Sequence, residues 1–226
     1  MESLQRQASS LQYVAVHPDG YDAEKSYPLV VLLHGFGANM HDLASLAPAI
    51  DSTGYVYLFP NAPLTISFGP GMTGSAWTPI ANDKTAADVA NAEALVTGFV
   101  DEMVSLYRPG PGRVLLGGFS QGGMMTYQVG LPRPDTFAGL VALSGRIDAA
   151  DALAGRLPQE REQPVFIAHG TGDPLIAVHH ARESRDFLVG HGYQPIYHEF
   201  PIAHEISQAV LDQLAPWVQR VLPPAS

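Results

Sequence analysis

The chain contains no cysteine and few basic residues, and both absences limit what the protein can be. Without cysteine there are no disulfides, no thiolate metal ligands and no cysteine nucleophile. Lysine and arginine together number 12 against 22 acidic residues, which leaves a formal net charge of −10. The lysines are Lys25 and Lys84. This charge balance makes nucleic acid and anionic membrane surfaces poor partners.

Long hydrophobic runs are also missing. The longest strongly apolar run covers residues 28–33, far short of the roughly 20 residues that a membrane-spanning helix needs. Residues 1–10 are polar and lack the apolar centre of a signal peptide. We therefore expect a loose N-terminal segment, no stable membrane insertion and a cytoplasmic location.

What the chain does have is the composition of one folded domain. Its 226 residues are 46% hydrophobic and 15% charged, which predicts a single globular domain over residues 1–226. Short apolar runs alternate with stretches of helical periodicity, which predicts an α/β fold with a mostly parallel sheet flanked by helices. The expected strands lie at residues 27–33, 55–59, 114–116, 140–143, 165–168 and 196–200, and the expected helices around 89–106, 184–188 and 206–221.

The most informative motif follows the run at residues 114–116. It reads Gly-Phe-Ser-Gln-Gly, with Ser120 at its centre and a predicted helix after it. This is the G-x-S-x-G pattern between a strand and a helix, where a sharp turn exposes the serine hydroxyl. Gly118 and Gly122 flank the serine because side chains there would collide with the turn. We interpret Ser120 as a nucleophile.

A nucleophilic serine needs a base, and the base needs a carboxylate to orient it. In a sheet of this kind the chain order is serine, acid, histidine. Asp173 follows the predicted strand at residues 165–168, and His204 follows the last predicted strand. Because carboxyl ends of parallel strands meet at one edge of the sheet, we expect Ser120, Asp173 and His204 to form a catalytic triad.

The loop at residues 34–37 reads His-Gly-Phe-Gly and follows an earlier strand. In a sheet of this kind, that position supplies the second donor of an oxyanion hole. We assign the hole to the backbone N–H groups of Phe36 and Gln121. No metal or organic cofactor is needed for such chemistry.

These motifs together resemble the phospholipase/carboxylesterase family of small α/β-hydrolases, which includes acyl-protein thioesterases and bacterial carboxylesterases. The resemblance extends roughly from Tyr13 to Trp217. It implies the α/β-hydrolase fold, the triad and the oxyanion hole named above. The matching segments are residues 33–37, 117–124, 140–145, 169–174 and 203–206.

The substrate pocket is less well defined by the sequence. Few residues separate the strands at 140–143 and 165–168, so we expect no large cap domain and an open site. Residues 60–79 are predicted to form an apolar flap beside Ser120. The expected substrate-binding residues are Phe68, Met72, Trp77, Leu175 and Ile176.

The function predicted from these residues is a serine carboxylesterase that hydrolyses short- to medium-chain carboxylic esters of small molecules. An acyl thioesterase or a lysophospholipase would use the same triad and stays open as an alternative. A more remote alternative is a binding protein without turnover on the same scaffold. Trp77 and Met72, if exposed, leave a homodimer open as well.

Overall fold

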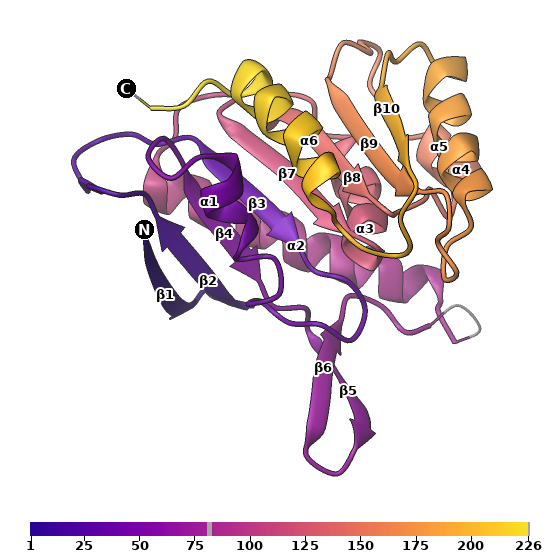
Figure 1. Ribbon diagram of the computed structural model, residues 1–226, viewed down its shortest axis with the longest axis horizontal. Coiled ribbons are helices and arrows are strands. Elements are labelled where there is room, and N and C mark those ends of the chain that lie inside the picture. Colours follow the sequence, from indigo (N-terminus) through magenta and orange to yellow (C-terminus); the bar gives the residue numbers. More distant parts are fainter. Residues whose placement is uncertain (81–82, 226) are drawn as a thin grey trace.

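The computed structural model describes residues 1–80 and 83–225, and a single twisted sheet forms its centre (Figure 1). In spatial order the eight strands are β1 (Glu2–Gln7), β2 (Gln12–His17), β4 (Val56–Pro60), β3 (Leu29–Leu33), β7 (Val114–Phe119), β8 (Phe137–Leu143), β9 (Val165–Gly170) and β10 (Ile196–Phe200). From β4 to β10 every neighbouring pair is parallel, whereas β1 and β2 add an antiparallel edge. The predicted α/β-hydrolase fold with a mostly parallel sheet is confirmed.

Helices cover both faces of this sheet. One face is covered by α2 (Ala86–Tyr107), α3 (Gln121–Gly130), α4 (Ala150–Ala154) and α5 (Val178–Gly190), and the other by α1 (Leu46–Ile50) and α6 (Gln208–Val221). Strand β3 shows why the central strands are continuously apolar. Its consecutive residues Val30 and Val31 point to opposite faces of the sheet and enter different hydrophobic cores. Both faces of the strand are therefore buried.

The N-terminal segment differs from its prediction. Residues 1–10 were expected to be loose, but β1 pairs with β2 from Glu2 opposite His17 to Gln7 opposite Gln12. Most of its side chains are exposed. The strand therefore completes backbone hydrogen bonds at the sheet edge and buries little apolar surface, which is why hydrophobic patterning does not detect it.

The segment at residues 60–79 also has regular structure of its own. Strands β5 (Leu64–Gly69) and β6 (Met72–Ala76) form an antiparallel hairpin that projects from the body of the molecule (Figure 1). Its base lies beside the loop after β3, because Gly37 N–H donates to Ser75 O at 2.8 Å and Ser75 N–H donates to Ala38 O at 2.7 Å. In the described part of the chain, no helix combines the length and the apolar character needed to cross a bilayer.

Candidate active site

Ser120 occupies a strained turn between β7 and α3. Its backbone angles are φ 55° and ψ −117°, a combination that costs energy for any residue with a Cβ atom. The turn is crowded: a Cβ atom at Gly118 would lie 2.4 Å from the backbone of Gly122, and one at Gly122 would lie 1.9 Å from Leu33 O. Both glycines are therefore required for the turn that presents the Ser120 hydroxyl.

Asp173 and His204 lie after β9 and β10 and form a hydrogen-bonded pair. His204 Nδ1 donates to Asp173 Oδ2 at 2.6 Å. The other carboxylate oxygen accepts the backbone N–H groups of Leu175 and Ile176, both at 2.9 Å. Burial by itself would raise the pKa of Asp173, but these hydrogen bonds hold the pKa below its usual range. Asp173 is thus kept as a carboxylate aimed at His204.

The loop between β9 and α5 is held by a second histidine. His169 Nε2 donates to Ile176 O at 2.7 Å and lies 3.4 Å from Asp173 Oδ2. Its side chain is fully buried. His169 therefore supports the turn that carries Asp173, a structural role in line with its position at the end of a strand.

The β10 end of the pair faces the nucleophile turn. The ring of His204 lies 4.8 Å from the ring of Phe119, the residue before Ser120. Among the described residues the Ser120 hydroxyl has no hydrogen-bond partner, and such contacts often tighten only when substrate is bound. The structure thus brings the three predicted triad residues to the same sheet edge with the Asp173–His204 contact formed.

The loop after β3 passes directly beside Ser120. A Cβ atom at Gly35 would lie 3.3 Å from Ser120 Cβ. In the described part of the chain the Phe36 N–H has no hydrogen-bond partner, and Gln121 is the first residue of α3, where N–H groups lack intrahelical partners. Both predicted oxyanion donors are therefore free among the described residues and lie next to Ser120, at a helix end that favours negative charge.

His34 holds this loop from inside the protein. Its Nδ1 donates to Gly35 O at 2.8 Å, and its Nε2 accepts the Ala62 N–H at 3.0 Å. The indole of Trp77 donates to His34 O at 2.9 Å. Burial lowers the pKa of His34, so the imidazole is neutral and can accept at Nε2.

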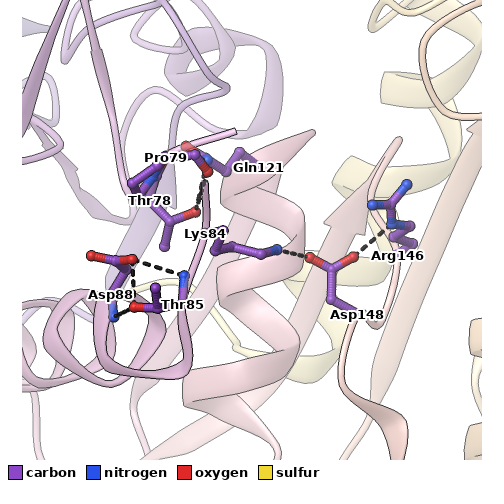
Figure 2. A network of polar contacts seen from close by, with 8 residues as sticks. All are labelled: Thr78, Pro79, Lys84, Thr85, Asp88, Gln121, Arg146 and Asp148. Atoms are coloured by element: carbon purple, nitrogen blue, oxygen red, sulfur yellow. Dashed lines mark hydrogen bonds and ion pairs between the residues drawn. The ribbon is translucent and has the colours of Figure 1, made fainter. Parts of the chain in front are cut away.

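The side chain of Gln121 makes contacts that the sequence did not reveal. Its Oε1 accepts the Trp77 backbone N–H at 2.8 Å. Its Nε2 donates to Thr78 O at 2.9 Å and to Thr78 Oγ1 at 3.1 Å (Figure 2). The amide therefore ties the start of α3 to the chain that follows the hairpin. Only the backbone of Gln121 was predicted to matter, because no sequence signal links these distant segments.

The predicted substrate-binding residues lie in different surroundings. Phe68 and Met72 are 55% and 64% exposed on the hairpin, and Leu175 is 72% exposed beside Asp173. Trp77 is only 1% exposed and Ile176 6%. The expectation that Trp77 might be exposed is wrong, because its indole packs beside His34 in the core. Phe68 covers the oxyanion loop, since a Cβ atom at Gly37 would lie 2.7 Å from its ring.

A cavity of about 280 Å³ is lined in part by Gln121 and Thr78. Its remaining walls come from α2, α3, α4 and the segment between β8 and α4. The apolar side chains that line it are Val89, Met124, Met125, Ile147 and Leu153. Sequence analysis did not assign these residues to the pocket, although Met124 and Met125 lie just after the Gly-Phe-Ser-Gln-Gly motif, with Gly123 between.

On α5, His179, His180 and Glu183 place three potential metal-ligand atoms within 4.8 Å of one another. His179 and Glu183 are exposed, and His180 Nδ1 is hydrogen-bonded to Glu183 at 3.0 Å. The hydrogen bond between two of its members accounts for this arrangement without a bound ion.

Comparison with known proteins agrees with this geometry. The model of the phospholipase/carboxylesterase family matches residues 21–222. Acyl-protein thioesterase 1 of Kluyveromyces lactis is 30% identical over 184 residues, which cover 74% of this chain and 79% of that protein. The acyl-protein thioesterase 1 of Emericella nidulans is 26% identical over 223 residues, covering 88% and 92% of the two chains.

Solved structures show the same architecture. Esterase PE8 has a TM-score of 0.81 at 26% identity, with 94% of this chain and 100% of that chain covered. The carboxylesterase of Bacillus cereus has a TM-score of 0.76 at 19% identity, covering 94% and 95% of the two chains. This last likeness concerns the fold alone.

Proposed function

The chain belongs to the phospholipase/carboxylesterase family, a group of serine hydrolases that act on esters and thioesters, and we propose that it is a carboxylesterase for short- to medium-chain esters. Ser120 would attack the ester carbonyl, His204 would accept the serine proton, and Asp173 would orient His204. The 2.6 Å hydrogen bond between Asp173 and His204 carries this proposal.

That hydrogen bond defines what each nitrogen of His204 can do. Because Nδ1–H is bound to Asp173 Oδ2, the other ring nitrogen, Nε2, has a lone pair available for the Ser120 proton. After the serine oxygen bonds to the carbonyl carbon, the imidazolium would return the proton to the leaving alcohol. Water, activated by the same histidine, would then hydrolyse the acyl-enzyme and regenerate Ser120.

The negative oxygen of the tetrahedral intermediate would lie between the N–H groups of Phe36 and Gln121. Such donors act strongly because they are held in place before the reaction, each contributing about 3 kcal/mol in well-studied hydrolases. The support for this assignment is positional. Gly35 approaches Ser120 closely, and the hairpin holds the loop through Gly37 and Ser75.

The cavity beside Gln121 is the proposed site of the acyl chain. An apolar cavity of about 150 Å³ holds a benzene-sized molecule, so a volume of about 280 Å³ suits an acyl chain on the order of ten carbons. Its apolar lining favours alkyl groups over polar ones. Gln121 lines the cavity and also belongs to the proposed oxyanion hole, which supports an acyl chain bound in this cavity with its carbonyl near Ser120.

The test is steady-state hydrolysis of p-nitrophenyl esters from acetate to palmitate, with Ser120→Ala in parallel. We expect turnover to be highest at short or medium chains and kcat to fall about 10⁶-fold in the variant. Turnover that persists in Ser120→Ala would contradict the proposal. If no ester is turned over, labelling by a fluorophosphonate probe distinguishes an active serine with another substrate from a binding protein.

A thioester substrate is the second candidate, and the similarity to acyl-protein thioesterase 1 favours it. Esters and thioesters pass through similar tetrahedral intermediates, so the triad does not separate them. Paired oxygen and sulfur esters with the same acyl group give the preference directly. A kcat/KM ratio well above one for the thioester would make thioesterase the main activity, and lysophosphatidylcholine in the same assay would test the lysophospholipase alternative.

A further inference from the structure

A salt bridge crosses the cavity beside Gln121. Lys84 Nζ pairs with Asp148 Oδ2, and Arg146 Nε donates to Asp148 Oδ1 at 2.6 Å (Figure 2). Lys84 precedes α2 and Asp148 lies between β8 and α4, so the contact joins two walls of the cavity. We call Lys84, Asp148 and Arg146 the charged gate.

The charged gate differs chemically from the rest of the cavity. Lys84 and Asp148 both line it, among predominantly apolar side chains of α2, α3 and α4. Figure 2 shows the Lys84 side chain reaching across from the chain before α2 to the Asp148 carboxylate. The aliphatic stem of a lysine in this position can pack against an alkyl chain while its ammonium group stays with the carboxylate.

Local structure positions both ends of the gate. Thr85, next to Lys84, caps α2: Asp88 N–H donates to Thr85 Oγ1 at 3.2 Å, and Thr85 N–H donates to Asp88 Oδ2 at 2.8 Å. This reciprocal cap anchors Lys84 to the first turn of a long helix. At the other end Arg146 binds the carboxylate oxygen that Lys84 leaves free.

The Asp148 carboxylate is charged at neutral pH, and the ion pair is only partly buried. Burial alone would raise the pKa of Asp148, but hydrogen bonds and charges of Lys84 and Arg146 hold the pKa below its usual range. The side chains of Lys84 and Asp148 are 21% and 26% exposed. A partly exposed ion pair contributes little net stability. Separating Lys84 from Asp148 therefore costs little free energy.

From this arrangement we propose that the charged gate sets the upper size of the acyl group. With the ion pair formed, Lys84 and Asp148 narrow the cavity that both of them line, and an acyl chain that outgrows it must separate the two charges. The gate is thus a specificity device and takes no part in the chemistry. This proposal rests on the proposed carboxylesterase function and deepens it by naming what limits its substrates.

Three variants test the gate without altering Ser120, Asp173 or His204. Lys84→Met keeps an apolar stem and removes the charge, and Asp148→Asn keeps the shape and removes the charge. The change Lys84→Asp with Asp148→Lys, made together with Arg146→Ala so that the new lysine does not face the Arg146 guanidinium, reverses the pair and should restore closure in part. Lys25→Met is the matched control, because Lys25 is the other lysine of the chain and lies in the exposed loop before β3.

The expected result is a shift in chain-length preference. The ratio of kcat/KM for p-nitrophenyl dodecanoate to kcat/KM for p-nitrophenyl butyrate should rise about tenfold in Lys84→Met and in Asp148→Asn. A change of this size corresponds to room for one or two more methylene groups of the acyl chain. The reversed pair should bring the ratio back towards wild type, and Lys25→Met should leave it unchanged. Folded variants with a wild-type ratio would overturn the proposal.

A binding measurement separates failure of the gate from failure of the function. In a Ser120→Ala background, saturated fatty acids from hexanoate to hexadecanoate stabilise the protein against heat in proportion to their binding. We expect the longest stabilising fatty acid to be longer when Lys84→Met is added. If wild type cleaves no ester but this shift occurs, the result supports the charged gate and contradicts the carboxylesterase proposal. If Lys84→Met does not change the longest stabilising fatty acid, the proposal of a charged gate is contradicted, whether or not the protein cleaves esters.

Discussion

Asp173 and His204 form a 2.6 Å hydrogen bond although they follow different strands and lie 31 residues apart in the chain. The loops after β9 and β10 meet because these strands are parallel neighbours, with Phe200 opposite Gly170. The bond therefore depends on sheet register as well as on the two side chains. Because it occupies Nδ1 of His204, Nε2 is the ring nitrogen left available.

Asp173→Asn tests this relationship. The amide can still accept the N–H groups of Leu175 and Ile176 through its oxygen, but its NH₂ group would face His204 Nδ1 and stabilise the wrong tautomer. We expect kcat to fall about 10⁴-fold while the fold is kept. Ester hydrolysis and circular dichroism measure the two effects. Asp186→Asn, an exposed change on α5, should leave both untouched, and a loss below tenfold in Asp173→Asn would argue against the triad.

Ser120→Gly should stabilise the protein compared with Ser120→Ala. Ser120 has φ 55° and ψ −117°, a conformation that glycine adopts at little cost and alanine does not. We expect the free energy of unfolding to be about 1 kcal/mol higher in Ser120→Gly than in Ser120→Ala, with both variants inactive. Urea denaturation gives the difference. Equal stability of the two variants would show that the turn stores no strain.

Gly74→Ala should disturb the oxyanion loop from a distance. A Cβ atom at Gly74 would lie 1.9 Å from Gly37 O, so the hairpin or the loop must move. We expect kcat to fall roughly 10- to 100-fold, since displacement of about 1 Å near reacting atoms has effects of that size. Gly98→Ala is the control, because that position in α2 has open space and alanine favours helix. A wild-type kcat in Gly74→Ala would show that the position of the hairpin does not affect catalysis.

We expect the free energy of unfolding to decrease as the pH is lowered, because His34 is buried. Burial lowers the pKa of His34 below its ordinary value of 6.5, so below that pH the unfolded chain binds a proton that the folded imidazole resists. The free energy of unfolding then decreases as pH falls, by at most about 1.4 kcal/mol per pH unit for one proton. Between pH 7 and 5, His34→Gln should lose less stability than wild type does.

Urea denaturation at pH 8, 7, 6 and 5 measures the dependence on pH. Burial also lowers the pKa of His17, so His34→Gln should reduce the slope and not abolish it. The exposed His41 provides the control, and His41→Gln should follow wild type. Parallel curves for His34→Gln and wild type would mean that His34 is not the group responsible.

The candidate triad could be located from local patterns, and its catalytic role stays a prediction. Ser120 lies in a strand–turn–helix motif of a few residues, and Asp173 and His204 each follow a recognisable strand in the expected chain order. Strand β1 could not be predicted, because its polar residues bury little and its partner β2 supplies the reason for its structure. Trp77 was misjudged for a related reason, since its burial depends on His34, which lies 43 residues away.

The sequence by itself determined the parallel sheet, the turn at Ser120 and the positions of Asp173 and His204 after strands, because these follow from short-range periodicity and from glycines where a side chain would collide with the turn. Only the tertiary structure decided which side chains line the cavity, how the hairpin holds the oxyanion loop and that Lys84 meets Asp148 across 64 residues. Those contacts arise where separate elements pack together, and no local pattern records which faces will meet.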